Sequence, residues 1–175
     1  RLPRNFLGMS VAHLGAAVTV VGITLTTAWS VEKDLRFAPD TTHEVAGYEF
    51  RFFGVRDFDG PNYRAERALV EVSRNGRVVA QLFPEKRHYL NSQAPMTEAA
   101  IDPGLTRDIY VALGDPLGDG AWAVRVYHKP FVRWIWLGGL LMALGGLLAV
   151  SDRRYRIAVK APARRGIDAS ALAGS

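Results

Sequence analysis

Two long apolar stretches constrain this chain more than any other feature of its sequence. Residues 6–28 contain no Asp, Glu, Lys or Arg, and residues 131–150 contain one charged side chain, Arg133, near their start. A helix rises ~1.5 Å per residue, so residues 6–28 reach ~35 Å, which is enough to cross the hydrocarbon core of a bilayer. Arg133 is close to a helix end, where a long side chain can extend to the headgroups. The sequence therefore predicts a membrane protein with two transmembrane helices.

Basic residues beside the two spans predict their orientation. Arg1 and Arg4 precede the first span, and six basic residues follow the second: Arg153, Arg154, Arg156, Lys160, Arg164 and Arg165. Because Lys and Arg beside a span favour the cytoplasm, we expect residues 1–5 to be a cytoplasmic end, residues 151–175 a cytoplasmic basic tail and residues 29–130 a periplasmic domain. That domain holds 13 basic and 15 acidic side chains, so the pI of about 9.8 comes from the flanks and does not indicate nucleic-acid binding.

The region between the spans, residues 29–130, has the pattern of β structure. Apolar and polar residues alternate in short runs, which is the period of a strand with one buried face. Residues 66–73 and 77–83 flank Asn75-Gly76, a pair that supplies the positive φ angles of a tight hairpin turn. Other alternating apolar residues are Tyr48, Phe50, Phe52, Ile109, Val111, Leu113, Trp122, Val124 and Val126. We expect five or six short antiparallel strands, either closed into a small barrel, such as an OB-like barrel, or packed as a sandwich.

The composition excludes several kinds of chemistry. The chain has no cysteine, so no thiol chemistry can occur in it. The sequence contains no Gly-rich phosphate loop, no His-x-x-x-His pair and no nucleophile elbow. We therefore expect neither conventional hydrolase chemistry nor nucleotide chemistry.

One ionisable side chain, His13, lies inside the first predicted span. It is ~10 Å along the helix axis from Phe6, and an intramembrane histidine normally faces a bundle interior, a cavity or a cofactor. Ala16 and Ala17, one helical turn later, leave space on that face for the edge of a porphyrin. The alternative is a histidine that hydrogen-bonds another helix or a carbonyl, and the residues alone do not decide between the two.

Glycines recur every seven residues in both spans. The first span has Gly8, Gly15 and Gly22, and the second repeats Leu-Gly-Gly-Leu-Leu at residues 137–141 and 144–148. Small residues at this spacing let backbones approach closely, so we expect both spans to pack within a larger helical bundle. At ~100° per residue, His13 lies about 140° around the helix from Gly8, away from the glycine seam. One face should therefore pack while another can hold a ligand.

Residues 95–114 mix apolar and charged side chains without a clear period before Ile109. Two interpretations are open for this segment. It is either a docking surface, on which Glu98, Arg107 and Asp108 make directional contacts, or a long loop packed on the domain, with Arg107 paired to Glu98.

Several short motifs follow one another along the chain: Gly8-Met9, Ala12-His13-Leu14-Gly15, Gly60-Pro61-Asn62-Tyr63-Arg64, Pro84-Glu85-Lys86-Arg87, and residues 95–101, 106–114 and 134–139. In this order and spacing, from about Arg1 to Tyr155, the sequence resembles the C-terminal part of the CcmF/NrfE family of cytochrome c-type biogenesis haem lyases. Because the chain also begins with Arg1 rather than Met, we expect it to be a piece of a longer protein.

The resemblance implies a multi-pass protein of the bacterial inner membrane that receives haem from the chaperone CcmE. It implies covalent attachment of that haem to the Cys-x-x-Cys-His motif of apocytochrome c outside the cytoplasm, with CcmH and, in some organisms, CcmI presenting the apocytochrome. A transmembrane histidine of the family is an axial ligand of a haem b, and His13 matches that histidine by position. The second axial ligand of the iron must then come from a helix outside this chain.

The sequence departs from the family's pattern in one respect. It lacks the tryptophan-rich periplasmic motif and the two flanking histidines that hold the transferred haem, so we assign no catalytic residue. For His43, His88 and His128 we expect surface or hydrogen-bonding roles. The alternative to a portion of a haem lyase is a non-catalytic, membrane-anchored periplasmic β module that recruits a partner protein, with His13 serving only helix packing.

Overall fold

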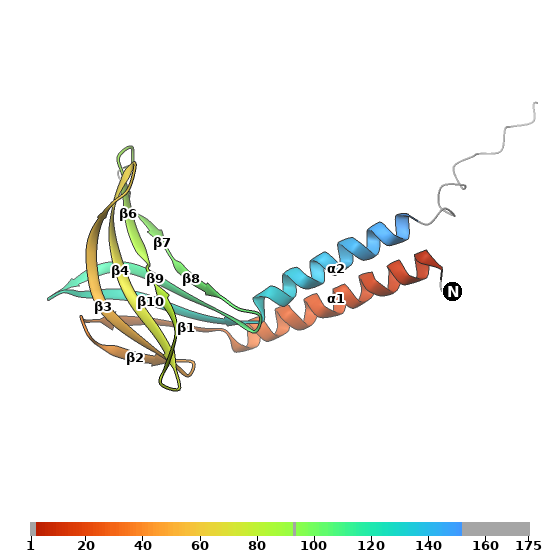
Figure 1. Ribbon diagram of the computed structural model, residues 1–175, viewed down its shortest axis with the longest axis horizontal. Helices are drawn as coiled ribbons and strands as arrows, with labels where there is room; N and C mark the ends of the chain where they lie inside the picture. Colours follow the sequence, from red (N-terminus) through yellow and green to blue (C-terminus); the bar gives the residue numbers. More distant parts are fainter. Residues whose placement is uncertain (1–2, 93, 152–175) are drawn as a thin grey trace, which may run out of the picture.

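The computed structural model describes residues 3–92 and 94–151 and contains two long helices with a β domain between them (Figure 1). The helices are α1 (Arg4–Trp29) and α2 (Val132–Val150). The strands are β1 (Val31–Phe37), β2 (Thr42–Val45), β3 (Tyr48–Asp59), β4 (Tyr63–Arg74), β5 (Arg77–Leu82), β6 (Glu85–Tyr89), β7 (Met96–Glu98), β8 (Ala100–Pro103), β9 (Arg107–Gly118) and β10 (Ala121–Pro130). Apart from Ser151, the predicted basic tail lies outside the described residues, so its cytoplasmic position stays a prediction.

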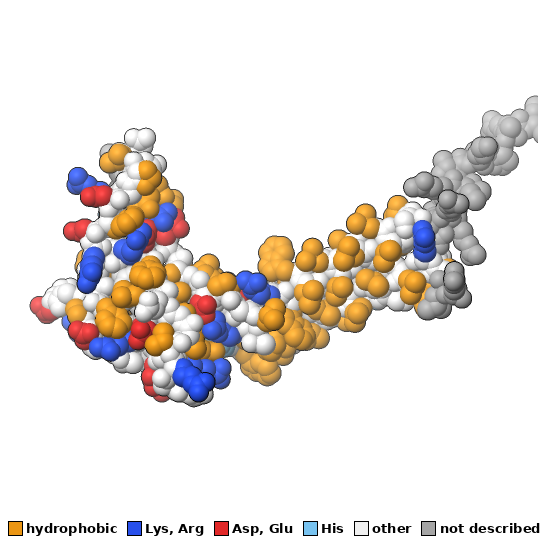
Figure 2. All heavy atoms as spheres, in the orientation of Figure 1, with side chains coloured by type: hydrophobic (Ala, Val, Ile, Leu, Met, Phe, Trp, Pro, Cys, Tyr) orange, Lys and Arg blue, Asp and Glu red, His pale blue; other side chains and the backbone are white. Residues whose placement is uncertain are grey.

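Both helices are long and apolar enough to cross a membrane. They lie side by side and antiparallel, so the Arg4 end of α1 and the Val150 end of α2 are together, away from the β domain (Figure 1). Figure 2 shows hydrophobic side chains over the visible face of the helix pair, whereas most of the Lys, Arg, Asp and Glu side chains in view lie on the β domain. Little of either helix is buried in the chain itself, so most apolar side chains face outward.

Glycines form the contact between the two helices. The buried residues of α1 are Gly8, Gly15 and Gly22, and those of α2 are Gly138 and Gly145. A Cβ atom placed on Gly15 would lie 2.6 Å from the backbone nitrogen of Met142, which is closer than van der Waals contact allows. The predicted glycine seam is therefore confirmed, and its reason is direct backbone-to-backbone packing.

The β domain is an antiparallel sandwich of two sheets. One sheet has the order β1-β10-β9-β8, and the other has the order β2-β3-β4-β6-β7, with β5 also paired to β4. Every pairing is antiparallel. The predicted class, two helices flanking a small antiparallel β domain, is confirmed, and of the two predicted closures the sandwich is the one observed.

The core of the sandwich contains the apolar residues that alternate in the sequence. The largest fully buried side chains include Phe37, Phe50, Phe52, Ile109 and Leu113. At the predicted hairpin, Asn75 and Gly76 have φ angles of 52° and 72°, and the turn joins β4 to β5. The described residues contain ten strands rather than five or six. Among the strands that the prediction missed, β1 and β6 are charged segments, Val-Glu-Lys-Asp-Leu-Arg-Phe and Glu-Lys-Arg-His-Tyr, with few apolar residues to alternate.

The β domain is joined closely to the helix pair. Only Ser30 separates α1 from β1, and only Phe131 separates β10 from α2. The hydroxyl of Thr26 on α1 donates a hydrogen bond of 2.7 Å to the carbonyl of Pro130, and the amide of Phe131 donates to the carbonyl of Thr106 at 3.1 Å. These bonds fix the end of the sandwich that contains His128 and Arg107 against the helix ends.

Candidate functional site

The structure places His13 on the exposed face of α1. The side chains of His13, Ala16 and Ala17 are all exposed, whereas Gly15 is buried against α2. The predicted separation of the histidine from the glycine seam is therefore observed. His13 takes no part in the contact between α1 and α2, so packing of this helix pair does not explain its presence in the span.

A backbone hydrogen bond fixes the proton arrangement of the His13 ring. Its Nδ1 atom lies 2.8 Å from the carbonyl oxygen of Met9, one turn earlier in α1. A carbonyl oxygen only accepts hydrogen bonds, so Nδ1 must carry the proton and donate it. In the neutral ring, Nε2 is then unprotonated and has its lone pair available. Metal-binding histidines usually have this arrangement, with one nitrogen bonded to a carbonyl and the other free for the metal.

The residues around His13 fit one axial position of a haem. Ala16 and Ala17 have the smallest side chains apart from glycine, and both are exposed on α1 one turn after His13, so they leave space beside it. Among residues 3–92 and 94–151, no group of three or more His, Cys, Asp or Glu side chains could hold a bare metal ion. A single imidazole suits a metal whose other ligands come from a macrocycle and from a second protein segment.

The other three histidines all lie in the β domain. His43 Nε2 lies 3.1 Å from the carbonyl oxygen of Arg36, and its ring contacts Phe37 edge-on at 4.6 Å between centroids. His88 lies 3.7 Å from Glu66. These two have the hydrogen-bonding and surface roles that we predicted. His128 differs, because its buried Nδ1 has no hydrogen-bond partner within the described part of the chain.

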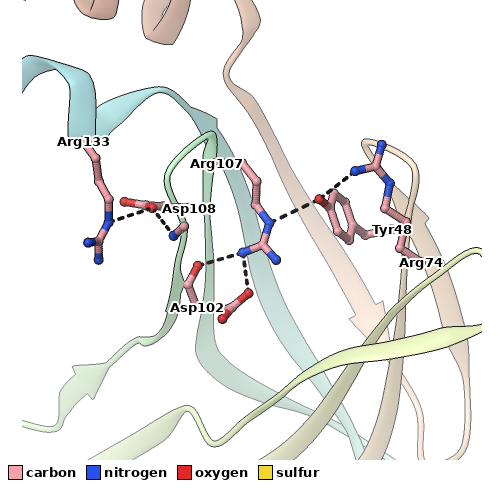
Figure 3. Close-up of polar contacts among 7 residues, drawn as sticks. Tyr48, Arg74, Asp102, Arg107, Asp108 and Arg133 are labelled. Carbon is pink, nitrogen blue, oxygen red and sulfur yellow. Dashed lines mark hydrogen bonds and ion pairs between the residues drawn. The ribbon is translucent and has the colours of Figure 1, made fainter.

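His128 belongs to a polar cluster at the end of the sandwich beside the helices, which we call the basal polar cluster: Tyr48, Arg74, Arg107 and His128. The Tyr48 hydroxyl accepts hydrogen bonds from Arg74 at 3.1 Å and from Arg107 at 3.2 Å (Figure 3). The rings of Tyr48 and His128 are 5.8 Å apart between centroids. Two guanidinium groups thus converge on one buried phenol and lie beside an imidazole, so a further positive charge is disfavoured there.

The basal polar cluster was not predicted from the sequence, although the sequence contains a signal for it. Each member continues an alternating run of inward-facing residues by one more step. Tyr48 precedes Phe50 and Phe52, Arg107 precedes Ile109 and Val111, Arg74 follows Val70 and Val72, and His128 follows Val124 and Val126. Polar residues at the ends of inward-facing runs indicate the rim of the core, where they cap it.

The cluster predicts how the stability of the β domain depends on pH. Burial lowers the pKa of His128, and the positive charges of Arg107 and Arg74 lower it further. The unfolded chain therefore binds more protons than the folded domain once the pH falls below about 6.5, the ordinary histidine pKa. We expect the free energy of unfolding to fall as the pH is lowered through about 6.5, by about 1.4 kcal/mol for each unit by which the pKa is lowered.

Urea unfolding of the β domain in the full-length protein, followed by circular dichroism, checks this pH dependence. His128→Gln should flatten the decrease, because it removes the titrating ring. Thr106→Ser, a change near the same end of the domain that alters no ionisable group, should leave the decrease as it is in the wild type. Equal slopes for the wild type and His128→Gln would show that another group causes the decrease.

The structure corrects the predicted pairing within residues 95–114. Arg107 does not pair with Glu98; it forms an ion pair with Asp102 and also donates to the Asp102 carbonyl at 3.1 Å (Figure 3). Glu98 instead lies 3.6 Å from Arg87 on β6. Asp108 is buried, accepts a hydrogen bond of 2.9 Å from the amide of Gly104 and lies 3.9 Å from Arg133. Short strands β7 and β8 hold the segment in the two sheets, so most of its charged groups serve the fold.

Comparison with known proteins identifies the family. A family model described as the CcmF C-terminal beta-sandwich matches residues 28–130. The chain is 55% identical over 166 residues to "Cytochrome c-type biogenesis protein CcmF" of Pseudomonas fluorescens, covering 95% of this chain and 25% of that protein. It is 52% identical over 152 residues to the protein of the same name from Escherichia coli K12, covering 87% of this chain and 24% of that protein. The chain thus spans about a quarter of the length of these relatives.

A solved structure named "Cytochrome c Heme Lyase CcmF" has the same architecture. It superposes with a TM-score of 0.69 and 25% sequence identity, over 85% of this chain and 25% of that one. Together with the two apolar helices, these relatives fit a membrane protein. The resemblance that the sequence motifs indicate is confirmed: the chain belongs to the CcmF family of cytochrome c-type biogenesis proteins and corresponds to the C-terminal part of such a protein.

Proposed function

We propose that this chain is the C-terminal portion of a membrane haem lyase and that His13 is an axial ligand of a resident haem b. One observation carries the proposal: the Nδ1–H···O=C bond to Met9 leaves Nε2 of His13 free on an exposed face of α1. The alternative role, a histidine that only hydrogen-bonds a carbonyl, has the same bond to Met9. The ligand role is favoured because Nε2 makes no hydrogen bond with any described residue and the side chain is exposed.

Each part of the chain has a separate task in this proposal. His13 binds the iron, and the Met9 carbonyl holds the ring in one tautomer and orientation. The glycine seam keeps α1 against α2, so the opposite face of α1 stays at a constant position for the remaining helices of the protein. When bound, the haem supplies one-electron redox chemistry, whose potential depends on the second axial ligand and on the surrounding dielectric.

The covalent chemistry belongs elsewhere in the full-length protein. His13 is 16 residues before the end of α1, so the haem site lies ~24 Å along the helix axis from the β domain. The tryptophan-rich haem-handling motif is outside this chain as well. We propose that the β domain lies in the periplasm and both ends of the chain in the cytoplasm, in the bacterial inner membrane. There the β domain stands beside the site where CcmE delivers haem and CcmH, with CcmI in some organisms, presents the Cys-x-x-Cys-His motif of apocytochrome c.

Two measurements test this function. The purified, reduced full-length protein should have the spectrum of a bis-histidine b-type haem, and a strain without the gene should accumulate no c-type cytochromes until the gene is restored. A haem-free protein would favour the alternative, a membrane-anchored β module that recruits a partner. A b-type spectrum combined with normal cytochrome c maturation in the deletion strain would instead indicate a haem b subunit without a lyase role.

A further inference from the structure

The outer face of the β3–β4 sheet has a groove lined by aromatic residues. We call it the outer groove; its walls are Phe53, Phe58, Leu69 and Phe83, with Arg56 and Arg67 on the rim. Its volume is about 310 Å³, at the small end of ligand pockets and suited to one or two side chains rather than a cofactor. Phe53 is 40% exposed and Phe83 is 50% exposed. An antiparallel sheet with one buried face normally presents polar residues on the other, so this apolar groove needs an explanation.

Two irregularities of the sheet create the outer groove. In β3 the register with β4 shifts between Phe52 and Val55, and Gly54 has a φ angle of 103°, which favours glycine. Phe53 faces outward by the ordinary alternation from the buried Phe52, and the bulge that follows it places Arg56 opposite Arg67. On its other side, β4 pairs with β6 along its first half and with β5 along its second half. Between these two pairings, the amide of Ala68 donates a hydrogen bond of 2.9 Å to the carbonyl of Pro84. Phe83 stands at this change of partner, across β4 from the bulge.

The side chains around the outer groove have the composition of a protein-binding surface. The Arg67 guanidinium lies over the Phe58 ring at 3.4 Å from its centroid, and Arg51 lies over Phe53 at 4.7 Å. Exposed aromatic rings with stacked arginines are enriched at the energetic centres of protein interfaces. Because the rings are already held by these contacts, little side-chain freedom would be lost on binding.

The charges at the rim favour an acidic partner. Arg56 is directly opposite Arg67 in the β3–β4 ladder, and like charges in this position destabilise a sheet. Arg67 is balanced by Glu85, a buried carboxylate clamped between Arg67 and Arg87. Burial alone would raise the pKa of Glu85, but its hydrogen bonds from Arg87 and Arg67 outweigh burial and hold the pKa below its usual value. Arg56 has neither a hydrogen bond nor an ion pair with any described residue, although Asp57 also lines the groove.

The position of the outer groove argues for a protein rather than a lipid. The helices join β1 and β10, which belong to the other sheet (Figure 1). The groove residues Arg67 and Leu69 flank the buried Ala68 in β4, so the groove opens on the face of β4 that points away from the core. A ligand there would come from the aqueous side. Because the groove is shallow and lies across adjacent strands, an extended chain with one apolar side chain fits it better than a folded domain.

We propose that the outer groove binds an unfolded, acidic segment of the apocytochrome, with an apolar side chain against Phe53 and Phe83 and a carboxylate on Arg56. This inference rests on the proposed function, because that function supplies an unfolded substrate. The segment would be accessible only before haem attachment, since the finished cytochrome is folded. The groove would thus hold the apoprotein near the lyase and release the product.

A fluorescent peptide tests the outer groove in the full-length protein in lipid nanodiscs. The probe is a short peptide with one phenylalanine flanked by aspartates, and fluorescence anisotropy measures its binding. Phe83→Ser and Arg56→Gln should each weaken binding about tenfold or more, as loss of an interface centre does. The matched controls are Val79→Ser, an exposed apolar residue of β5 outside the groove, and Arg36→Gln, an exposed arginine of β1. Both should bind like the wild type.

Competition decides what occupies the outer groove. Unfolded apocytochrome c should displace the peptide, whereas the folded holocytochrome of the same sequence should not. Absence of saturable binding, equal binding by Phe83→Ser, or equal competition by the two forms of the cytochrome would overturn the proposal. The assay requires no haem, so its failure leaves the haem spectrum and the cytochrome deficiency of the deletion strain as independent tests of the proposed function.

Discussion

His13→Ala should remove the b-type haem spectrum from the full-length protein while the protein still accumulates in the membrane. Within the described residues His13 is the sole histidine of either helix, so no neighbour in α1 or α2 can replace its imidazole. The side chain is exposed and outside the glycine seam, so its removal leaves the α1–α2 contact intact. We expect haem per protein to decrease at least about tenfold, because removal of even a supporting group around a metal typically costs about 10–100-fold in affinity.

The reduced-minus-oxidised spectrum and the haem content per protein measure this effect. Leu14→Ala is the matched control, because Leu14 is the next residue of α1 and is 57% exposed. Added imidazole should partly restore the spectrum of His13→Ala, since the substitution leaves a space where the ring was, and should not change that of Leu14→Ala. An unchanged spectrum in His13→Ala would assign the iron to other residues of the protein and return His13 to a packing role.

The elements that the sequence predicts well are those fixed by local chemistry. The helices follow from uninterrupted apolar composition, and the β4–β5 hairpin follows from Asn75-Gly76, where the positive φ angles are a property of the residues themselves. The alternation that begins at Tyr48 correctly predicted the buried face of β3. In contrast, β7 and β8 have only three and four residues, and they pair with β6 and β9. Segments this short cannot show a clear alternation of apolar and polar residues, so the sequence pattern did not predict them.

The candidate site, too, was predicted from the sequence only in part. The position of His13 away from the glycine seam follows from helical geometry alone, because the angle between residues 8 and 13 is fixed by the period. The position of the proton on the His13 ring does not follow from helical geometry, because it depends on which acceptor the ring contacts. That acceptor is the Met9 carbonyl. The outer groove was also beyond prediction. It needs a bulge in β3 and a change of partner along β4, which only the assembled sheet brings together.

The second large effect concerns the glycine seam itself. We expect Gly15→Ala to destabilise the full-length protein, although alanine is the better helix former by about 1 kcal/mol. The added Cβ would lie 2.6 Å from the nitrogen of Met142 and 2.7 Å from the carbonyl oxygen of Gly138. Both are backbone atoms, so no side chain can rotate away and the two helices must separate. Overpacking of this kind costs about 1–3 kcal/mol per site, which exceeds the gain in helix propensity.

Gly139→Ala is the matched control for Gly15→Ala. Gly139 is also a helical glycine, in the second span, but a Cβ there would meet nothing within 4 Å in the described structure. It should therefore be neutral or stabilising in a thermal unfolding assay in detergent, while Gly15→Ala lowers the midpoint. Gly15→Ala should also weaken cross-linking between a pair of cysteines introduced into α1 and α2 and, because α1 positions His13, reduce haem retention. If both alanine variants unfold at the same temperature, helix propensity rather than the backbone contact determines the stability of the helix pair. The contact with α2 would then not be needed to position His13 on α1.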